Sequence, residues 1–274
     1  MPADLHTHST FSDGTDSPEE LVRLAAAAGL TTIALTDHDN VDGIEQAAEA
    51  GRGVGVEVIP GIEFTTENSR AELHILGYFI DYRSEPLLAV LQKVQHGRVK
   101  RIDKIVQKLN KLGVDIEPSD VFSISGEKAP GRPHVARALI KRGAVGSFKE
   151  AFDRYLDWRA PAYVPHYKLA PIEAIKLIKE AGGIPVFAHP AISNCDDLVP
   201  KLVEAGLRGL EVYYPGYYRD MIDHYLALAK KHDLLVTGGT DFHGEGSGRE
   251  IKLGDLTVPD ELVDKLKNEH LRGN

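Results

Sequence analysis

Histidines and carboxylates gather at six places along the chain, each at the end of a short apolar run or just after one. In an α/β domain the carboxyl ends of the strands meet at one rim, so side chains that follow different strands can converge there. Imidazole and carboxylate ligands together suit Zn²⁺, Mn²⁺ or Fe²⁺. The pattern predicts a site for more than one metal ion. The clusters are Asp4-Leu5-His6-Thr7-His8, Thr36-Asp37-His38-Asp39, Gly61-Ile62-Glu63-Phe64, Glu72-Leu73-His74, Ala188-His189-Pro190 and Thr240-Asp241-Phe242-His243.

The spacing within two clusters is informative by itself. His6 and His8 are separated by one residue, and alternate side chains of an extended segment point to the same side. The pair can therefore hold one ion, although two hydrogen-bonded barrel histidines are the alternative interpretation. Asp241 and His243 repeat this spacing, and the glycines around them let the backbone approach closely.

For the other candidate metal ligands, the sequence gives weaker evidence. Glu63 is a carboxylate where an apolar interior is expected, and burying it without a partner would be costly, so we expect it to bridge two cations. An exposed loop acid is the alternative. His38 lies between two acids, either of which can orient its imidazole. His74 lies in an apolar run, where a core histidine with satisfied hydrogen bonds is the main alternative. His189 ends an apolar strand.

The composition narrows the class of protein. The chain has 274 residues, enough for one α/β barrel, and a formal net charge of -9, which argues against broad electrostatic binding to nucleic acid. Its single cysteine, Cys195, excludes an intrachain disulfide and a thiolate metal cage. No apolar run approaches the roughly 18 residues of a membrane span. We expect a soluble, cytoplasmic protein that does not bind membranes; its oligomeric state is not predicted.

Strands and helices alternate in both halves of the chain. Ser17 and Pro18 predict the start of a helix that ends near residue 28. Strands are expected at residues 31–36, 56–60 and 73–79, with a helix at residues 41–50 between the first two. Strands at 184–188, 209–212 and 234–237 alternate with helices at 171–181, 198–205 and 220–232, and a last helix at 260–270 is expected to pack outside. Residues 1–83 and 166–274 are predicted to form the barrel. Residues 84–165 are predicted to be a helical insertion over its rim.

The ordered clusters resemble the polymerase and histidinol phosphatase (PHP) superfamily over nearly the whole chain. The resemblance implies a distorted (β/α)7 barrel with a trinuclear metal centre. It implies two to three divalent ions, with Mn²⁺ favoured and Fe²⁺ or Zn²⁺ as alternatives. The implied ligands are His6, His8, Glu63 and Asp241 for the first metal, Glu63, His74 and His189 for the second, and Asp13, His38 and His243 for the third.

The segment Gly131-Arg132-Pro133-His134 and the insertion resemble one branch of this superfamily, which includes 3',5'-nucleoside bisphosphate phosphatases and enzymes that trim RNA from the 5' end. The resemblance implies that Arg132 and His134 act in catalysis and contact the substrate phosphate, a role suited to guanidinium. A surface charge near a helix start is the alternative for Arg132. Further substrate-binding candidates are Lys168, Arg249 and Ser125.

We therefore predict a phosphoric monoester hydrolase in which a metal-bridging hydroxide attacks the 3'-phosphate of a nucleoside 3',5'-bisphosphate. The partner is a small phosphorylated nucleotide. Alternatives are a 5'-3' exonuclease on short RNA or DNA, a histidinol phosphatase, and a non-catalytic metal-binding module. The basic run at residues 98–101 could follow a nucleic-acid backbone, although a solvated helix face is favoured. Tyrosines at 213–218 suit either a nucleobase pocket or core packing.

Overall fold

Seven strands form one sheet in chain order in the computed structural model, which describes residues 2–125, 129–165 and 167–273. Beyond the two edge strands, the backbone amide of His8 donates to the carbonyl of Phe242 at 2.9 Å, so the sheet curls into a nearly closed barrel. The α/β barrel predicted from the sequence is confirmed. The strands are β1 (Ala3–Thr7), β2 (Thr32–Leu35), β3 (Glu57–Glu67), β4 (Glu72–Tyr78), β5 (Ile184–Phe187), β6 (Gly209–Tyr213) and β7 (Leu235–Gly238).

One strand runs against the others. β4 is antiparallel to both β3 and β5, while the other neighbouring pairs are parallel. The amino-terminal end of β4, where His74 lies, therefore meets the rim formed by the carboxyl ends of the other strands. β3 is also longer than predicted, because it continues to Glu67 by pairing with β4. Glu63 thus lies within a strand rather than after one.

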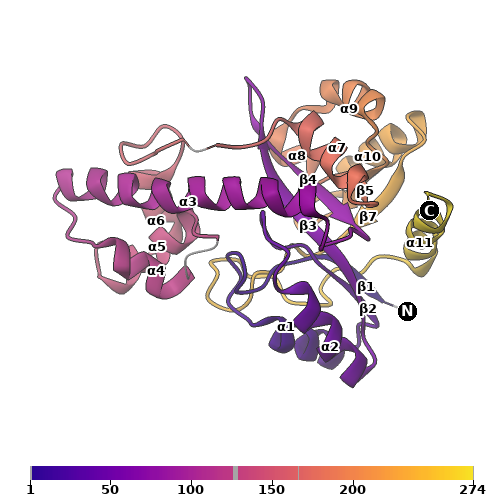
Figure 1. The fold of residues 1–274 in the computed structure, drawn as a ribbon, viewed down its shortest axis with the longest axis horizontal. Coiled ribbons are helices and arrows are strands. Elements are labelled where there is room, and N and C mark those ends of the chain that lie inside the picture. The colour runs from indigo at the N-terminus through magenta and orange to yellow at the C-terminus, as the bar shows by residue number, and fades with distance from the viewer. Residues whose placement is uncertain (1, 126–128, 166, 274) are drawn as a thin grey trace.

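Helices cover the outside of the barrel (Figure 1). Ser17 and Glu20 form the capping box of α1 (Pro18–Ala27), which packs against α2 (Ile44–Val54). The second half of the chain adds α7 (Pro171–Glu180), α8 (Pro190–Ser193), a 3-10 turn (Asp196–Leu198), α9 (Val199–Ala205) and α10 (Arg219–Lys231). Among the described helices, none combines the length and hydropathy that a membrane crossing requires.

The last helix, α11 (Asp260–Gly273), does more than pack outside, as the sequence suggested. Val263 and Leu266 belong to the same buried cluster as Leu5 and Tyr78 of the barrel interior. Val258, just before the helix, pairs with Ala3 at the start of β1. The helix therefore closes the end of the barrel opposite the histidine-rich rim.

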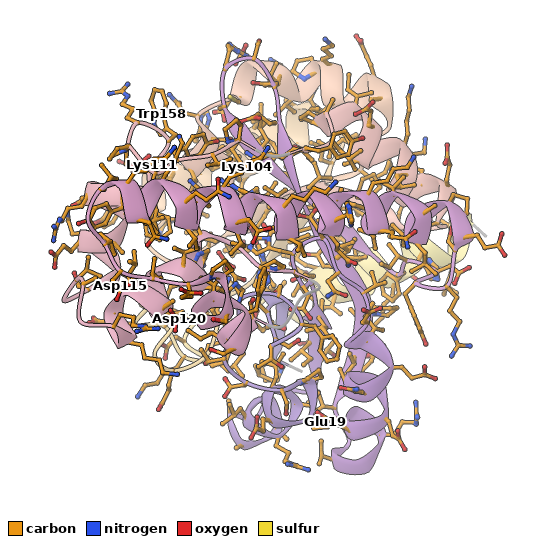
Figure 2. All side chains as sticks on the ribbon, turned by 60° about the vertical axis from the view of Figure 1, so that its left-hand side comes forward. Glu19, Lys104, Lys111, Asp115, Asp120 and Trp158 are labelled. Atoms are coloured by element: carbon orange, nitrogen blue, oxygen red, sulfur yellow. The ribbon has the colours of Figure 1, made fainter. Side chains whose placement is uncertain are left out.

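The segment between β4 and α7 is helical. Its elements are α3 (Glu85–Lys111), α4 (Pro118–Ser125), α5 (Arg132–Lys141), α6 (Phe148–Ala151) and a π-helical turn (Phe152–Leu156). In Figure 1 the long α3 reaches from the barrel to this group. Its first turns pack on the barrel core, whereas its second half joins a separate apolar core built with the shorter helices. Lys104 and Lys111 are exposed on α3 (Figure 2). The division of the chain at residues 84 and 165 stays a prediction.

Candidate metal centre and adjoining cavities

The structure brings all nine predicted metal ligands to one rim of the barrel. Three of them come from the strands themselves, namely His6 in β1, Glu63 in β3 and His74 in β4. The other six lie on the segments that follow β1, β2, β5 and β7. The convergence therefore follows from the strand directions. These six are His8, Asp13, His38, His189, Asp241 and His243.

Glu63 lies at the centre of the cluster, and its side chain is 1% exposed. Its Oε1 atom lies 2.8 Å from His74 Nδ1 and 3.0 Å from His189 Nε2. Its Oε2 atom lies 3.3 Å from Nε2 of both His6 and His8, and 2.9 Å from His38 Nδ1. The two oxygens therefore face different sets of imidazoles, which is the arrangement of a bridging carboxylate.

The two remaining carboxylates complete the cluster. Asp241 Oδ1 lies 3.1 Å from His8 Nε2 and 3.5 Å from His6 Nε2. Asp13 Oδ1 lies 3.1 Å from His243 Nε2. Among the described residues, three sets of donor atoms come close enough together to hold an ion each: His6, His8, Glu63 and Asp241; His38, Glu63 and His74; and His8, Asp13, His38 and His243.

The donor atoms fit divalent cations. Seven buried side-chain atoms of the cluster have no hydrogen-bond partner in the part of the chain that the structure describes, although buried polar atoms are almost always paired. Each belongs to at least one group of donor atoms that lie close together, so cations bound within these groups would satisfy them. The atoms are Nε2 of His6, His8 and His243, Nδ1 of His38, Oε2 of Glu63 and Oδ1 of Asp13 and Asp241.

The electrostatics also favour positive charge. Burial lowers the pKa of His8, but Asp241 and Glu63 outweigh it and raise that pKa to about 9. His74 is similar: against the effect of burial, Glu63 and Glu72 raise its pKa to about 10. Burial and the neighbouring His8 lower the pKa of His243 to about 4. The carboxylates thus create a field that attracts cations to the cluster.

A buried glutamate that the sequence analysis missed orients two of these histidines. Glu211 in β6 is fully buried, and its Oε1 lies 2.9 Å from His6 Nδ1, which leaves His6 Nε2 facing the cluster. Its Oε2 accepts from the backbone amide of His189 at 2.7 Å, where the backbone has φ 27°. A charged residue within an apolar strand was the available signal, as it was for Glu63.

The acids beside His38 do not orient its ring, contrary to the sequence-based expectation. Asp37 accepts hydrogen bonds from the Ser9 and Ser12 hydroxyls at 2.7 and 2.6 Å. Asp39 forms an ion pair with Arg98 and accepts from the Thr65 amide. Both acids fix loops around the site instead.

Close backbone packing at the rim requires one glycine in particular. A Cβ atom at Gly239 would lie 2.4 Å from the backbone nitrogen of His6. Since Gly239 follows β7 directly, this contact allows the segment carrying Asp241 and His243 to approach β1. The predicted close approach is confirmed.

A small cavity of about 190 Å³ lies against the cluster and is lined by arginines. Two of them, Arg98 and Arg101 of α3, are 7% and 4% exposed, so the favoured interpretation of residues 98–101 as a solvated helix face was wrong for both. Arg101 Nε donates to the Val164 carbonyl at 2.6 Å, and no described carboxylate forms an ion pair with it. A buried guanidinium that has no carboxylate partner among the described residues favours an anionic ligand. The other two are Arg132 and Arg249.

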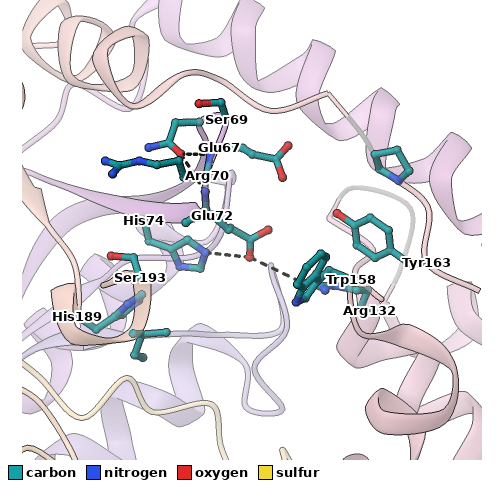
Figure 3. A pocket seen from close by; sticks show the side chains of 14 residues that line it. Glu67, Ser69, Arg70, Glu72, His74, Arg132, Trp158, Tyr163, His189 and Ser193 are labelled. Atoms are coloured by element: carbon teal, nitrogen blue, oxygen red, sulfur yellow. Dashed lines mark hydrogen bonds and ion pairs between the residues drawn. The ribbon is translucent and has the colours of Figure 1, made fainter. Parts of the chain in front are cut away.

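A larger cavity of about 620 Å³ adjoins the small one (Figure 3). Glu72, His74 and Arg132 line both. Trp158 and Tyr163 from the helical insertion stand on one side of the larger cavity, and Trp158 is 63% exposed. None of residues 213–218 lines this cavity, but Tyr214 lines a separate cavity of about 450 Å³ with Arg249, so the nucleobase pocket at residues 213–218 stays a prediction.

Arg132 is the predicted substrate residue that the structure places best. It begins α5, lines both cavities, and its guanidinium lies 5.7 Å from the Phe152 ring centre and 5.8 Å from that of Tyr163. Arg249 also lines the small cavity, and it forms an ion pair with Asp241. Lys168 pairs with Glu67 and Glu72, and its side chain is 3% exposed.

Two predicted substrate residues lie away from these cavities. His134 is 1% exposed, and its Nδ1 accepts from the Gly131 amide at 3.0 Å. Burial lowers its pKa to about 4. Ser125 ends α4, where its hydroxyl donates to the Val121 carbonyl at 3.3 Å. Neither side chain lines a described cavity, which favours indirect roles.

A third cavity, of about 340 Å³, opens on the other side of the cluster. Asp13 and His243 line it from the rim, and Arg137 and Phe148 line it from the insertion. It shares Asp13, Pro133, Phe152 and Arg249 with the small cavity. The three cavities therefore follow one another along the seam between the barrel and the helices. Together, the barrel and the histidine-carboxylate rim define an α/β-barrel metalloprotein.

Comparisons with known proteins agree with this class. The PHP domain pattern matches residues 4–115. The chain is 34% identical over 265 residues to a 5'-3' exoribonuclease of Haemophilus influenzae, covering 93% of this chain and 96% of the relative. It is 32% identical over 251 residues to a 3',5'-nucleoside bisphosphate phosphatase of Chromobacterium violaceum, covering 89% and 88%.

A solved structure supports the same conclusion. A protein of Bifidobacterium adolescentis, described as a metal-dependent phosphoesterase, superposes with a TM-score of 0.90 and 32% identity, covering 96% of this chain and 94% of that one. The chain therefore belongs to the PHP family of metal-dependent phosphoesterases.

Proposed function

We propose that the protein removes the 3'-phosphate of a nucleoside 3',5'-bisphosphate. The observation that carries this proposal is the pair of adjoining cavities beside the metal centre. The small, arginine-lined cavity suits phosphate groups, and the larger one, with Trp158 and Tyr163, suits a nucleobase. A nucleotide presents both chemistries in one molecule.

The nine rim residues would hold two to three divalent ions, among which Mn²⁺ is favoured for a donor set of nitrogen and oxygen alone. His6, His8, Glu63 and Asp241 would hold the first. Glu63, His74 and His189 would hold the second, and Asp13, His38 and His243 the third. When bound, such ions supply Lewis acidity that activates water and neutralises phosphate oxygens.

The arginines account for two phosphates. The scissile 3'-phosphate would face the rim side of the small cavity, where Asp13, His38 and His74 lie. Arg132 would bind its oxygens and stabilise the charge that grows there in the transition state. The 5'-phosphate would face Arg101, which lies in the same cavity and has no carboxylate partner among the described residues.

Other residues near the site would act by holding its side chains and loops in place rather than by contacting the substrate. Arg249 would hold Asp241 in place, since the two form an ion pair. His134 and Arg137 of α5 would support the loop carrying Asp13, because Arg137 donates to the Asp13 carbonyl at 2.6 Å. Residues 84–165 would thus form a substrate-binding insertion over the rim.

A 5'-3' exonuclease acting on short RNA or DNA is the second candidate, and the third cavity favours it. A phosphodiester has a nucleotide on each side of the reacting phosphorus, and cavities flank the small arginine-lined cavity on both sides. The exoribonuclease name of one relative points the same way. A monoester substrate leaves the third cavity without a role in binding.

The test is phosphate release by the Mn²⁺-loaded protein, with Asp241→Ala as the blank. The substrates are adenosine 3',5'-bisphosphate, histidinol phosphate, a 5'-monophosphate and a short 5'-phosphorylated RNA, the last also followed by mononucleotide release. We expect the bisphosphate to be preferred, and the activity to be lost in the variant. Preference for the RNA would establish the second candidate, and silence on all four would overturn both.

A further inference from the structure

Glu72 is a carboxylate in a region otherwise suited to anions. It lines both the small and the larger cavity, a property it shares with His74 and Arg132. Its side chain is 32% exposed, so it is accessible to a ligand. A carboxylate repels phosphate, so Glu72 is suited to a part of the substrate that carries a hydrogen-bond donor.

The contacts of Glu72 leave one oxygen able to accept. Oε2 forms an ion pair with Lys168, whose side chain is 3% exposed and which also lies 3.3 Å from Glu67 Oε1. Oε1 lies 3.5 Å from His74 Nε2 and 3.5 Å from Arg132 Nη2, both long contacts (Figure 3). Lys168 therefore anchors the carboxylate, while Oε1 retains lone pairs for a ligand.

If a nucleotide binds as proposed above, Glu72 lies at the position that its sugar would take. The sugar separates the phosphates from the base, and Glu72 lies where the arginine-lined cavity meets the cavity with Trp158. A ribose carries its 2'-hydroxyl beside the 3'-ester oxygen, so this donor must lie close to the reacting phosphate and to His74. Carboxylates bind ribose hydroxyls in the same manner in dinucleotide sites.

We propose that Glu72 accepts a hydrogen bond from the substrate's 2'-hydroxyl and so makes the site selective for ribonucleotides over deoxyribonucleotides. The proposal depends on the nucleotide function proposed above. A deoxy substrate leaves the charged oxygen facing a carbon, and hydrogen bonds to charged groups are worth enough to give roughly 10-fold to 100-fold discrimination.

The test compares kcat/KM for adenosine 3',5'-bisphosphate and its 2'-deoxy counterpart. The wild-type protein is expected to prefer the ribonucleotide by roughly 10-fold to 100-fold, and Glu72→Ala to show nearly equal values. Glu67→Ala is the matched control, because Glu67 also contacts Lys168 and lines the larger cavity but does not reach the small one. Its ribose preference should equal that of the wild type.

A binding measurement separates recognition from positioning. Calorimetric titration with adenosine 5'-monophosphate and its 2'-deoxy counterpart requires no turnover, so it applies even if Glu72→Ala is inactive. In this titration, Glu72→Ala is expected to bind the ribonucleotide and the deoxyribonucleotide about equally. A preference that survives in Glu72→Ala, or a wild-type protein that treats both sugars alike, would overturn the proposal while the bisphosphate function stands. Failure of the wild type to hydrolyse either bisphosphate would instead overturn the function.

Discussion

The barrel rim and the helical insertion contribute opposite chemistry to one site. The rim supplies buried imidazoles and carboxylates from strands and the segments after them, and seven of its side-chain atoms have no hydrogen-bond partner among the described residues. The insertion supplies Arg101, Arg132 and Trp158 from helices and loops with their own apolar core. We therefore expect metal binding to depend on the rim and substrate binding to depend largely on the insertion. Changes at the rim should abolish both metal binding and turnover, whereas changes in the insertion should leave metal binding intact.

The largest effect is expected from Glu63→Gln. The substitution replaces one bridging oxygen with an amide nitrogen that cannot bind a cation. We expect activity to fall by more than the roughly 100-fold that a supporting residue costs, and bound metal to fall with it. Turnover and metal content measured on the same sample provide the check. Retention of both would contradict the bridging role.

Arg132→Ala tests whether the insertion affects substrate turnover without affecting metal binding at the rim. The loss of hydrogen bonds to phosphate is expected to lower kcat/KM about 100-fold, with metal content unchanged. Arg142→Ala is the control, because Arg142 follows α5, is about half exposed and pairs with Asp120 at the surface. If Arg132→Ala also lost its metal, the separation between rim and insertion would be wrong.

Trp158→Ala should have a smaller effect, confined to binding. Stacking of a base on an aromatic ring contributes ~1–3 kcal/mol, so KM should rise about tenfold while kcat is retained. Tyr218→Ala removes an aromatic residue that is 78% exposed and lines none of the three cavities, and it should change neither value. Equal KM values for the two variants would remove Trp158 from the site.

The last prediction concerns the pH dependence of stability and His134, which does not line the described cavities. The pKa of its buried ring is lowered from 6.5 to about 4, so between these pH values the unfolded chain binds a proton that the folded chain does not. Stability should therefore fall as pH falls from 6.5 to 4, by up to about 3 kcal/mol. Denaturant unfolding of the metal-free protein and of His134→Gln should show a shallower loss in the variant. Parallel curves would contradict this.

The rim could be predicted from the sequence because its geometry depends on strand direction alone. His6 and His8 share one side of an extended segment, and Asp241 and His243 follow a strand directly, so their convergence needed no knowledge of packing. The resemblance to the PHP family supplied the grouping of ligands. Glu63 was predicted correctly as buried, although its strand proved longer because pairing with β4 extends it to Glu67.

The insertion could not be predicted in the same way. Arg98 and Arg101 look like a solvated helix face in sequence, and only the packing of α3 between the barrel and the shorter helices buries them. Trp158 lies in an irregular segment with no periodic signal. Glu211 was detectable, since a charge within an apolar strand is the signal that identified Glu63.

The most direct test is a crystal structure of the protein with Mn²⁺ and adenosine 5'-monophosphate, with the metals located by anomalous scattering. The account predicts manganese beside Glu63, the phosphate at Arg101 and Arg132, and the adenine against Trp158. Manganese away from Glu63, or adenine in the third cavity beside Phe148, would contradict it.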